Sequence, residues 1–220
     1  METRPLLIGH RGARAAKSVP ENTLEAFDFA LAHGCDGFEF DVRLSADGRA
    51  VVCHNATVRG LEVAQCSAQQ LGLPYLREVL QRYQASAFLD IELKVSGLEG
   101  ITLDLQRQLP PARGYVISSF LPEVVNTIHG MDATIPLGLI CETRDQFGQW
   151  DKLPIEYVIP QFKLASQSAI QQIHKAGKKV LVWTVNSAAD IKRFAECGVD
   201  GIVSDDPERL AAAMGRGPRS

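Results

Sequence analysis

Short apolar segments alternate regularly with amphipathic segments from Leu6 to Met214. The apolar segments have the length and composition of strands, and the segments between them carry apolar residues at helical spacing. The predicted strands are residues 6–8, 37–42, 87–93, 115–118, 135–140, 157–159, 180–185 and 201–203. Strands that alternate with helices pair in parallel through right-handed crossovers. Eight such units in about 200 residues predict one TIM (β/α)₈ barrel over residues 1–214, followed by a frayed tail at 215–220.

The segments between the strands predict the outer helices of this barrel. They are residues 24–31, 75–83, 98–109, 122–129, 144–150, 166–176, 188–196 and 207–214. Residues 55–74 are mostly polar or small, so we expect a loop there with one helical turn near 67–71. The alternative fold is an open doubly wound sheet, in which a glycine-rich phosphate loop typically follows an early strand. Gly9-His10-Arg11-Gly12 does not match G-x-G-x-x-G, which favours the barrel.

Composition and charge exclude several classes of protein. The chain has 220 residues, of which 45% are hydrophobic and 22% charged, as in soluble globular proteins. A net charge of −3, with Lys and Arg spread along the chain, provides no basic face for nucleic acid. No apolar run approaches the roughly 20 residues of a membrane span. Five scattered cysteines indicate reduced thiols, and the N-terminus lacks the apolar core of a signal peptide, so we expect a cytoplasmic protein.

Polar side chains gather where the first two strands end. His10 and Arg11 follow the first strand, and Glu39 and Asp41 lie on one face near the end of the second. Two neighbouring carboxylates repel each other unless a cation is present, and a metal ion is the simplest such cation. The Asp47-Gly48 pair predicts a hairpin whose returning strand, 50–54, places His54 opposite Phe40 or Asp41.

The third strand carries a second set of charged residues. Asp90, Glu92 and Lys94 share one face, and Leu89, Ile91 and Leu93 share the other. Because the carboxyl ends of barrel strands meet at one rim, we expect these residues to join those of the first two strands. Glu92 and Lys94 could instead form a structural ion pair.

Several motifs occur here in the order and approximate spacing of a known signature. They are His10-Arg11-Gly12, Pro20-Glu21-Asn22-Thr23, Glu39-x-Asp41, Asp47-Gly48 and His54. Together they resemble the glycerophosphodiester phosphodiesterase family. Ile91-Glu92-Leu93-Lys94 is similar to the family's Ile-Glu-x-Lys element, and 180–186 resembles its seventh strand. The resemblance implies hydrolysis of glycerophosphodiesters to sn-glycerol 3-phosphate and an alcohol.

The resemblance also implies roles for individual residues. Glu39, Asp41 and Glu92 would hold one divalent cation, and an oxygen ligand set suits Mg²⁺ or Ca²⁺. His10 and His54 would be the acid and the base, with a hydroxyl of the substrate's glycerol as internal nucleophile. Four further residues would support the reaction: Arg11 and Lys94 at the phosphate, Trp183 in the substrate pocket, and Glu21 near His10 and Arg11.

Some of these interpretations have plain structural alternatives. Trp183 could pack in the core, and Glu21 could be an ordinary acid in the first turn of a helix. Cys53 is adjacent to His54 on a strand, so the two side chains face opposite ways and a Cys-His dyad is not expected. Residues 118–120 and Lys163 lie at predicted strand ends without a firm role. Residues 200–207 support the fold more than the chemistry.

The sequence departs from the family pattern in two places. Asn55 stands where family members usually carry aspartate, and residues 55–74 are shorter than the usual insertion, which predicts a more open substrate pocket. The rival functions are a sphingomyelinase D-like or lysophospholipase D-like enzyme on the same barrel, and a barrel that binds a phosphoester without turnover. The first rival needs an exposed apolar surface for acyl chains, and the sequence shows no such loop.

Overall fold

Eight parallel strands close into a ring in the computed structural model, which describes residues 4–218. The ring closes because β1 pairs in parallel with both β11 and β2. Its strands are β1 (Leu6–Gly9), β2 (Gly37–Leu44), β6 (Phe88–Leu93), β7 (Tyr115–Ser119), β8 (Leu137–Cys141), β9 (Tyr157–Pro160), β10 (Lys179–Val182) and β11 (Gly201–Ser204). The predicted TIM barrel is therefore confirmed, and the open sheet is excluded.

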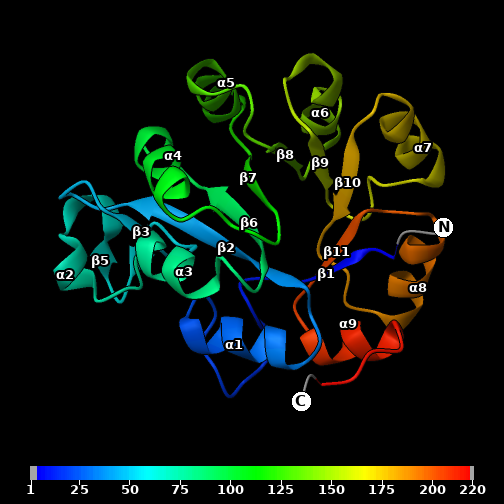
Figure 1. Ribbon diagram of the computed structural model, residues 1–220, viewed down its shortest axis with the longest axis horizontal. Coiled ribbons are helices and arrows are strands. Elements are labelled where there is room, and N and C mark those ends of the chain that lie inside the picture. Colours follow the sequence, from blue (N-terminus) through cyan, green and yellow to red (C-terminus); the bar gives the residue numbers. More distant parts are fainter. Residues whose placement is uncertain (1–3, 219–220) are drawn as a thin grey trace.

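Helices surround the strands, as Figure 1 shows. They are α1 (Leu24–Ala32), α3 (Leu76–Tyr83), α4 (Glu99–Gln108), α5 (Pro122–Met131), α6 (Arg144–Phe147), α7 (Gln167–Lys175), α8 (Ala188–Glu196) and α9 (Pro207–Ala213). Only α6 differs clearly from its predicted range, because it ends before Gly148 and a separate 3₁₀ turn covers Trp150–Lys152. No helix in the described part of the chain is long and apolar enough to cross a bilayer.

The predicted hairpin extends β2 beyond the barrel wall. Strand β3 (Ala50–Val52) pairs antiparallel with β2, with Val42 opposite Val52. Gly48 has a φ of +70°, which glycine adopts without the steric cost that other residues incur. This pairing continues β2 to Leu44, so Glu39 and Asp41 lie in the interior of the strand rather than near its end as predicted. The backbone N–H of Cys53 donates to the Asp41 carbonyl oxygen, which brings His54 next to the carboxylates.

Residues 55–74 contain more structure than the predicted loop. Two short strands, β4 (Thr57–Val58) and β5 (Leu61–Glu62), form a ribbon around Arg59-Gly60, and a 3₁₀ turn follows at Val63–Gln65. The predicted helical turn is present as α2 (Ala68–Leu71). Val63, Ala68 and Leu71 are buried against Val51 and Cys53, so this segment has a small apolar core of its own. The ribbon could not be predicted from the sequence, because strands of two residues are too short to show periodicity.

The core explains which way the site residues point. Phe38 and Phe40 pack outward against α1 and α3, where the Phe27 and Phe38 rings stack with centroids 4.2 Å apart and Tyr83 meets Phe38 edge-on. Because side chains alternate along a strand, Glu39 and Asp41 then point into the barrel. A separate interior cluster lies within the barrel and includes Ile8, Phe88, Val116, Tyr157 and Leu181.

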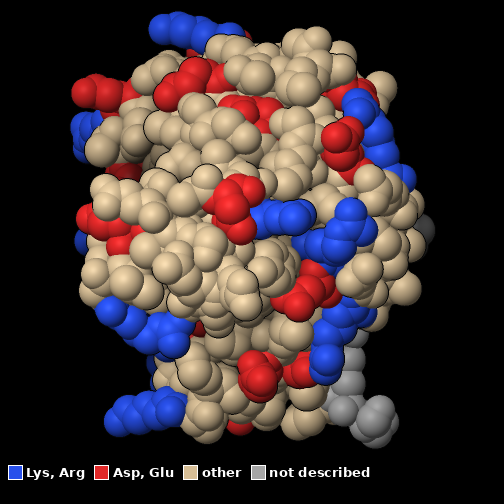
Figure 2. Space-filling model, turned by 90° about the vertical axis from the view of Figure 1, so that its left-hand side faces the viewer, with Lys and Arg blue, Asp and Glu red and all other residues tan. Residues whose placement is uncertain are grey.

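The surface and the chain end add little to the site. Figure 2 shows lysine and arginine interspersed with acidic side chains on the face that carries α2 and α3, without a single-sign basic patch there.

At the chain end, Arg216 Nη1 lies 2.7 Å from both carboxylate oxygens of Asp36. Part of the tail predicted to be frayed, residues 219–220, lies outside the described residues, and the domain boundary at 214 stays a prediction.

Candidate active site

The turn after β1 presents His10 and Arg11 to the barrel interior. A Cβ on Gly9 would lie 2.0 Å from the Gly12 carbonyl oxygen, so only glycine permits this tight exit. Arg11 has a φ of 49°, an uncommon value for a residue with a side chain. Its backbone N–H donates to Glu39 Oε2 at 2.9 Å. The exit of the first strand is thereby tied to the carboxylates of the second.

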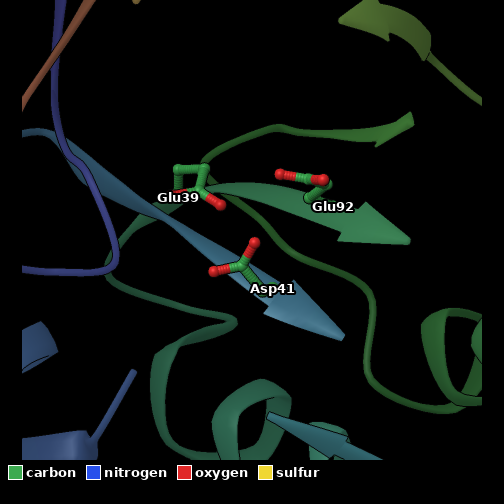
Figure 3. Close-up of side chains that lie close together, drawn as sticks. All are labelled: Glu39, Asp41 and Glu92. Carbon is green, nitrogen blue, oxygen red and sulfur yellow. The ribbon is translucent and has the colours of Figure 1, made fainter. Parts of the chain in front are cut away.

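Three buried carboxylates face one another across β2 and β6. Glu39 and Asp41 come from β2 and Glu92 from β6, where it stands beside Asp41 in the parallel register. Figure 3 shows them converging, and one oxygen of each lies within 4.8 Å of the others. Glu39 Oε1 is buried and accepts no hydrogen bond from the described residues. A buried carboxylate oxygen without a donor is costly, and a hard cation coordinated by oxygens would satisfy it.

Two cations partly offset this negative charge. Lys94 Nζ lies 2.6 Å from Glu92 Oε1 and 3.3 Å from Asp41 Oδ1. Arg11 Nε lies 3.3 Å from Asp41 Oδ2, which also accepts a hydrogen bond from Asn22 Nδ2 at 2.8 Å. The ion pair between Glu92 and Lys94 that the sequence left open is thus formed, with Lys94 at the edge of the carboxylate cluster.

The pKa values show how unevenly the charge is offset. Burial, followed by repulsion from Asp41 and Glu92, raises the pKa of Glu39 well above its ordinary value. Burial and Asp41 also raise the pKa of Glu92, against the opposing effect of Lys94. For Asp41 burial alone would raise the pKa, but Lys94, Asn22 and Arg11 together lower it. The cluster therefore disfavours a full set of ionised carboxylates without further positive charge, and its oxygen donors fit a divalent cation.

The two histidines reach the same cavity from different elements. His10 follows β1, and its Nδ1 lies 2.6 Å from Asp205 Oδ1 while its Nε2 lies 3.7 Å from Glu39 Oε2. His54 lies beyond β3, and its Nδ1 is 2.9 Å from Asn55 Oδ1. Burial is the main cause that lowers the pKa of His54. Both imidazoles line a cavity of about 460 Å³ together with Arg11, Glu39, Glu92, Lys94 and Trp183.

Glu21 contacts Arg11, as one of its two interpretations predicts. Its Oε1 accepts a hydrogen bond from Arg11 Nη1 at 2.8 Å, and its Oε2 lies 3.3 Å from Arg14 Nε. The N-cap of α1 is Thr23, so Glu21 precedes the helix and the first-turn interpretation is wrong. Glu21 is placed where it can hold the Arg11 guanidinium toward the cavity.

Trp183 packs against neighbouring side chains and also lines the cavity, so the core position and the pocket position that the sequence left open are both observed. Its Nε1 donates to the Ile159 carbonyl oxygen at 2.9 Å, and its ring meets that of Phe120 at 84° with centroids 5.6 Å apart. Phe120, at the end of β7, also lines the cavity, whereas Lys163 is exposed and does not.

Sequence reasoning missed two residues that contact the predicted ones. The segment 200–207 was expected to matter mainly for the fold, but Asp205 contacts His10 and accepts a hydrogen bond from Asn186 Nδ2 at 2.7 Å. Asp205 comes directly after β11, so the strand-end rule that located His10 could have found it. Asn22 belongs to the Pro20-Glu21-Asn22-Thr23 motif but was given no role of its own; in the structure it has a φ of 58°, a conformation that asparagine tolerates better than most residues.

A larger cavity, of about 880 Å³, lies away from these residues. It is an open hollow between the β2–β3 hairpin and the helices α3 and α4, lined by residues such as Arg49, Tyr75 and Asp104. Its charged side chains are of both signs, and no histidine is among its lining residues. The smaller cavity at the ends of the barrel strands is therefore the candidate active site.

Asp90 gives the metal-free protein a predictable pH dependence. Burial raises the pKa of Asp90 to about 7, although Ser118 Oγ donates to it at 2.6 Å. The folded carboxyl group holds its proton more tightly than the unfolded one, so its stabilising contribution is complete below pH 4 and is lost as the pH rises through 7. We expect this loss to be about 3 kcal/mol between pH 5 and pH 8.

Urea denaturation at both pH values, in EDTA, measures this effect. The variant Asp90→Asn keeps an oxygen for the Ser118 hydroxyl but does not titrate, so its free energy of unfolding should fall less over the same interval. Equal pH dependence in the two proteins would contradict the assignment.

Comparisons with known proteins agree with the geometry. The sequence model of the Glycerophosphoryl diester phosphodiesterase family matches residues 10–99 and 99–209. A glycerophosphodiester phosphodiesterase from Caldanaerobacter subterraneus subsp. tengcongensis is 28% identical, and the alignment covers 97% of this chain and 99% of that protein.

Solved structures show the same fold. A glycerophosphodiester phosphodiesterase from Parabacteroides distasonis superposes with a TM-score of 0.86 at 21% identity, covering 98% of each chain. A phosphodiesterase from Oleispira antarctica, solved in complex with the product sn-glycerol-3-phosphate, gives a TM-score of 0.84 at 23% identity over 96% of this chain and 97% of that one. The family match extends over most of the barrel and includes the cavity residues from His10 to Val203. This chain therefore belongs to the glycerophosphoryl diester phosphodiesterase family.

Proposed function

We propose that this protein hydrolyses glycerophosphodiesters to sn-glycerol 3-phosphate and an alcohol, with the help of one divalent cation. The observation that carries the proposal is the meeting of three buried carboxylates, two histidines, an arginine and a lysine in one cavity. Phosphodiester hydrolysis needs such a combination, because anionic charge must be offset while one proton is removed and another supplied. Family membership supports the same reaction.

Glu39, Asp41 and Glu92 would hold the cation, which is Mg²⁺ or Ca²⁺ in this proposal. When bound, it supplies positive charge against the phosphoryl oxygens. Arg11 can donate two parallel hydrogen bonds to phosphate oxygens, and Glu21 holds its guanidinium. Lys94 provides a further ammonium at the edge of the carboxylate cluster.

His10 and His54 would move the protons. One imidazole takes a proton from the nucleophilic hydroxyl, which the family implies is a hydroxyl of the substrate's own glycerol, and the other donates a proton to the leaving alkoxide. This attack releases the alcohol and leaves a cyclic glycerol phosphate. A water molecule then opens the ring to give sn-glycerol 3-phosphate, with the two imidazoles exchanging their roles. Asp205, at 2.6 Å, orients His10, whereas His54 has only the neutral Asn55. The two imidazoles therefore differ in their surroundings, as an acid and a base of one reaction do.

The test is release of glycerol 3-phosphate from glycerophosphocholine and glycerophosphoethanolamine. Release that EDTA abolishes and that Mg²⁺ or Ca²⁺ restores is the expected result, and the restoring ion is the metal. Folded protein that releases nothing with either ion would overturn the proposal and leave a binding barrel as the alternative.

A lipid-cleaving enzyme on the same barrel has less support. Among residues 4–218 the exposed large apolar side chains are Leu61 and Met131, which do not line the candidate active site. Small soluble diesters are therefore the substrates we propose, and a cytoplasmic location stays part of the proposal.

Asn55→Asp is expected to shift the pH–rate profile. A carboxylate beside Nδ1 favours the imidazolium form, so it should raise the pKa of His54 and move the limb controlled by this group upward by about half a pH unit to one pH unit. The direction is the same whether His54 is the acid or the base. Because the hydrogen bond that His54 Nδ1 donates to Asn55 Oδ1 also raises the pKa of His54, Asn55→Ala should move the same limb downward. Profiles of kcat against pH measure both shifts. If the two variants shift the limb in the same direction, or if neither shifts it, this role of Asn55 is contradicted.

A further inference from the structure

The candidate active site consists of two chemically different halves. The charged half comes from β1, β2, β6 and the end of β3, and it holds the histidines, the carboxylates, Arg11 and Lys94. The remaining wall comes from β7 to β11 and is mostly apolar. We call it the apolar half; its residues are Phe120, Ile140, Glu142, Gln146, Ile159, Trp183 and Val203. A phosphate in the charged half leaves one of its two ester substituents to lie against the apolar half.

Phe120 and Trp183 form an aromatic corner in the apolar half. Their ring planes meet at 84°, and the hydrogen bond from Trp183 Nε1 to the Ile159 carbonyl oxygen fixes one ring. Aromatic faces attract cations, most strongly where the cation is partly removed from water. Lys94 Nζ lies 5.4 Å from the Phe120 centroid, so one ring of this corner already contacts an ammonium group of the protein, and Trp183 is the ring that contacts no cation among residues 4–218.

Glu142 adds a carboxylate to the same half. It follows directly after β8, and the Gln146 side chain accepts a hydrogen bond from its backbone N–H at 2.9 Å. Its own side chain is exposed and forms no ion pair with any residue between 4 and 218. The other acidic side chains that line the cavity are Glu39, Asp90 and Glu92, all buried in the charged half. Glu142 is therefore an acid that neither the carboxylate cluster nor a neighbouring base uses.

We propose that the apolar half selects diesters whose alcohol is cationic, and in particular an N-methylated ammonium alcohol such as choline. The methyl groups would lie on Ile140, Ile159 and Val203, and the positive charge would face the aromatic corner and Glu142. A neutral polyol would find few hydrogen-bond partners on this wall beyond Glu142 and Gln146, so its hydroxyls would be poorly matched. The inference rests on the proposed function and specifies its substrate class.

The experiment compares glycerophosphocholine with its uncharged isostere, the 3,3-dimethylbutyl ester of glycerol 3-phosphate. The two differ only by carbon in place of the charged nitrogen, so the ratio of their kcat/KM values isolates recognition of charge. We expect a ratio of about ten in favour of choline, because the aromatic and carboxylate contacts together contribute on that scale. Glu142→Gln should lower kcat/KM for the choline ester and bring the ratio down to about two.

The matched control is Asp145→Asn. It removes the same charge from an exposed position three residues away, which does not line the cavity, and should leave the ratio unchanged. Equal cleavage of both esters by the native protein would overturn the inference but not the proposed function. A choline preference that survives Glu142→Gln, or that Asp145→Asn also abolishes, would overturn the assignment to Glu142. Failure to cleave either ester, with metal present, would overturn the proposed function and this inference with it.

Discussion

Glu39→Gln should reduce kcat/KM by a factor of about 10²–10³ and, at the same time, raise the melting temperature of the metal-free protein. Glutamine has the same shape and can still accept the hydrogen bond from the Arg11 backbone N–H through its amide oxygen. What it removes is a buried negative charge that Asp41 and Glu92 repel, as the raised pKa of Glu39 shows. The metal-free protein is relieved of this repulsion and becomes more stable. The site, however, loses one of the three anionic ligands that would hold the cation.

Asp41→Asn is the contrasting variant. The pKa of Asp41 is lowered by Lys94, Asn22 and Arg11 despite its burial, so its charge is the partner of two cations whose side chains are only 12% exposed. Removing that charge leaves both cations without full compensation, which is destabilising. We expect a comparable loss of activity but a lower melting temperature in EDTA. Steady-state kinetics with saturating metal and thermal denaturation in EDTA measure the two effects. The account fails if Glu39→Gln stays active or if both variants shift stability in the same direction.

His10→Ala is expected to lower kcat by about 10²–10⁴, the usual range for losing a general acid or base. Asp205→Asn should lower kcat by about 10² with little change in KM, because Asp205 acts through His10 and not on the substrate. The geometry supports this. His10 Nδ1 lies 2.6 Å from Asp205 Oδ1. Burial alone would raise the pKa of Asp205, but the hydrogen bond to His10, the charge of His10, the hydrogen bond from Asn186 and the charge of Arg14 together lower it to about 2. The carboxylate therefore fixes the imidazole with its other nitrogen toward the cavity.

The double variant distinguishes positioning from a merely structural role. If Asp205 works only by orienting His10, then His10→Ala combined with Asp205→Asn should be no less active than His10→Ala alone. Losses that multiply in the double variant would show that Asp205 acts by another route. Circular dichroism of each variant checks that the barrel has formed.

The barrel and half of its active site could be predicted from local patterns. Strand-helix alternation indicates the architecture because each apolar segment has few ways to be buried. Period-two alternation placed Glu39 with Asp41, and Glu92 with Lys94, on inward faces, and the structure agrees. Counting across the Asp47-Gly48 turn placed His54 opposite Phe40 or Asp41, which the pairing of Val42 with Val52 confirms. The strand-end position of Glu39 and Asp41 was wrong, because β3 extends β2.

The contacts that required the tertiary structure join residues far apart in the chain. Asp205 meets His10 only because β1 pairs with β11 when the ring closes, across 195 positions of sequence. Asn22 reaches Asp41 through a left-handed backbone conformation that no periodicity reveals. Glu21 can contact Arg11 because it lies in the turn before α1, which begins only at Leu24, and not in the first turn of that helix.

The sequence by itself determined the fold, the inward-facing charges and the family resemblance, because alternation and turn chemistry act over a few neighbouring residues. Only the tertiary structure decided which groups touch. Strand register and ring closure set distances of 2.6–3.3 Å between side chains from β1, β2, β6 and the end of β11. Those distances decide which carboxylates stay charged, which histidine is oriented, and which wall of the cavity remains for the alcohol.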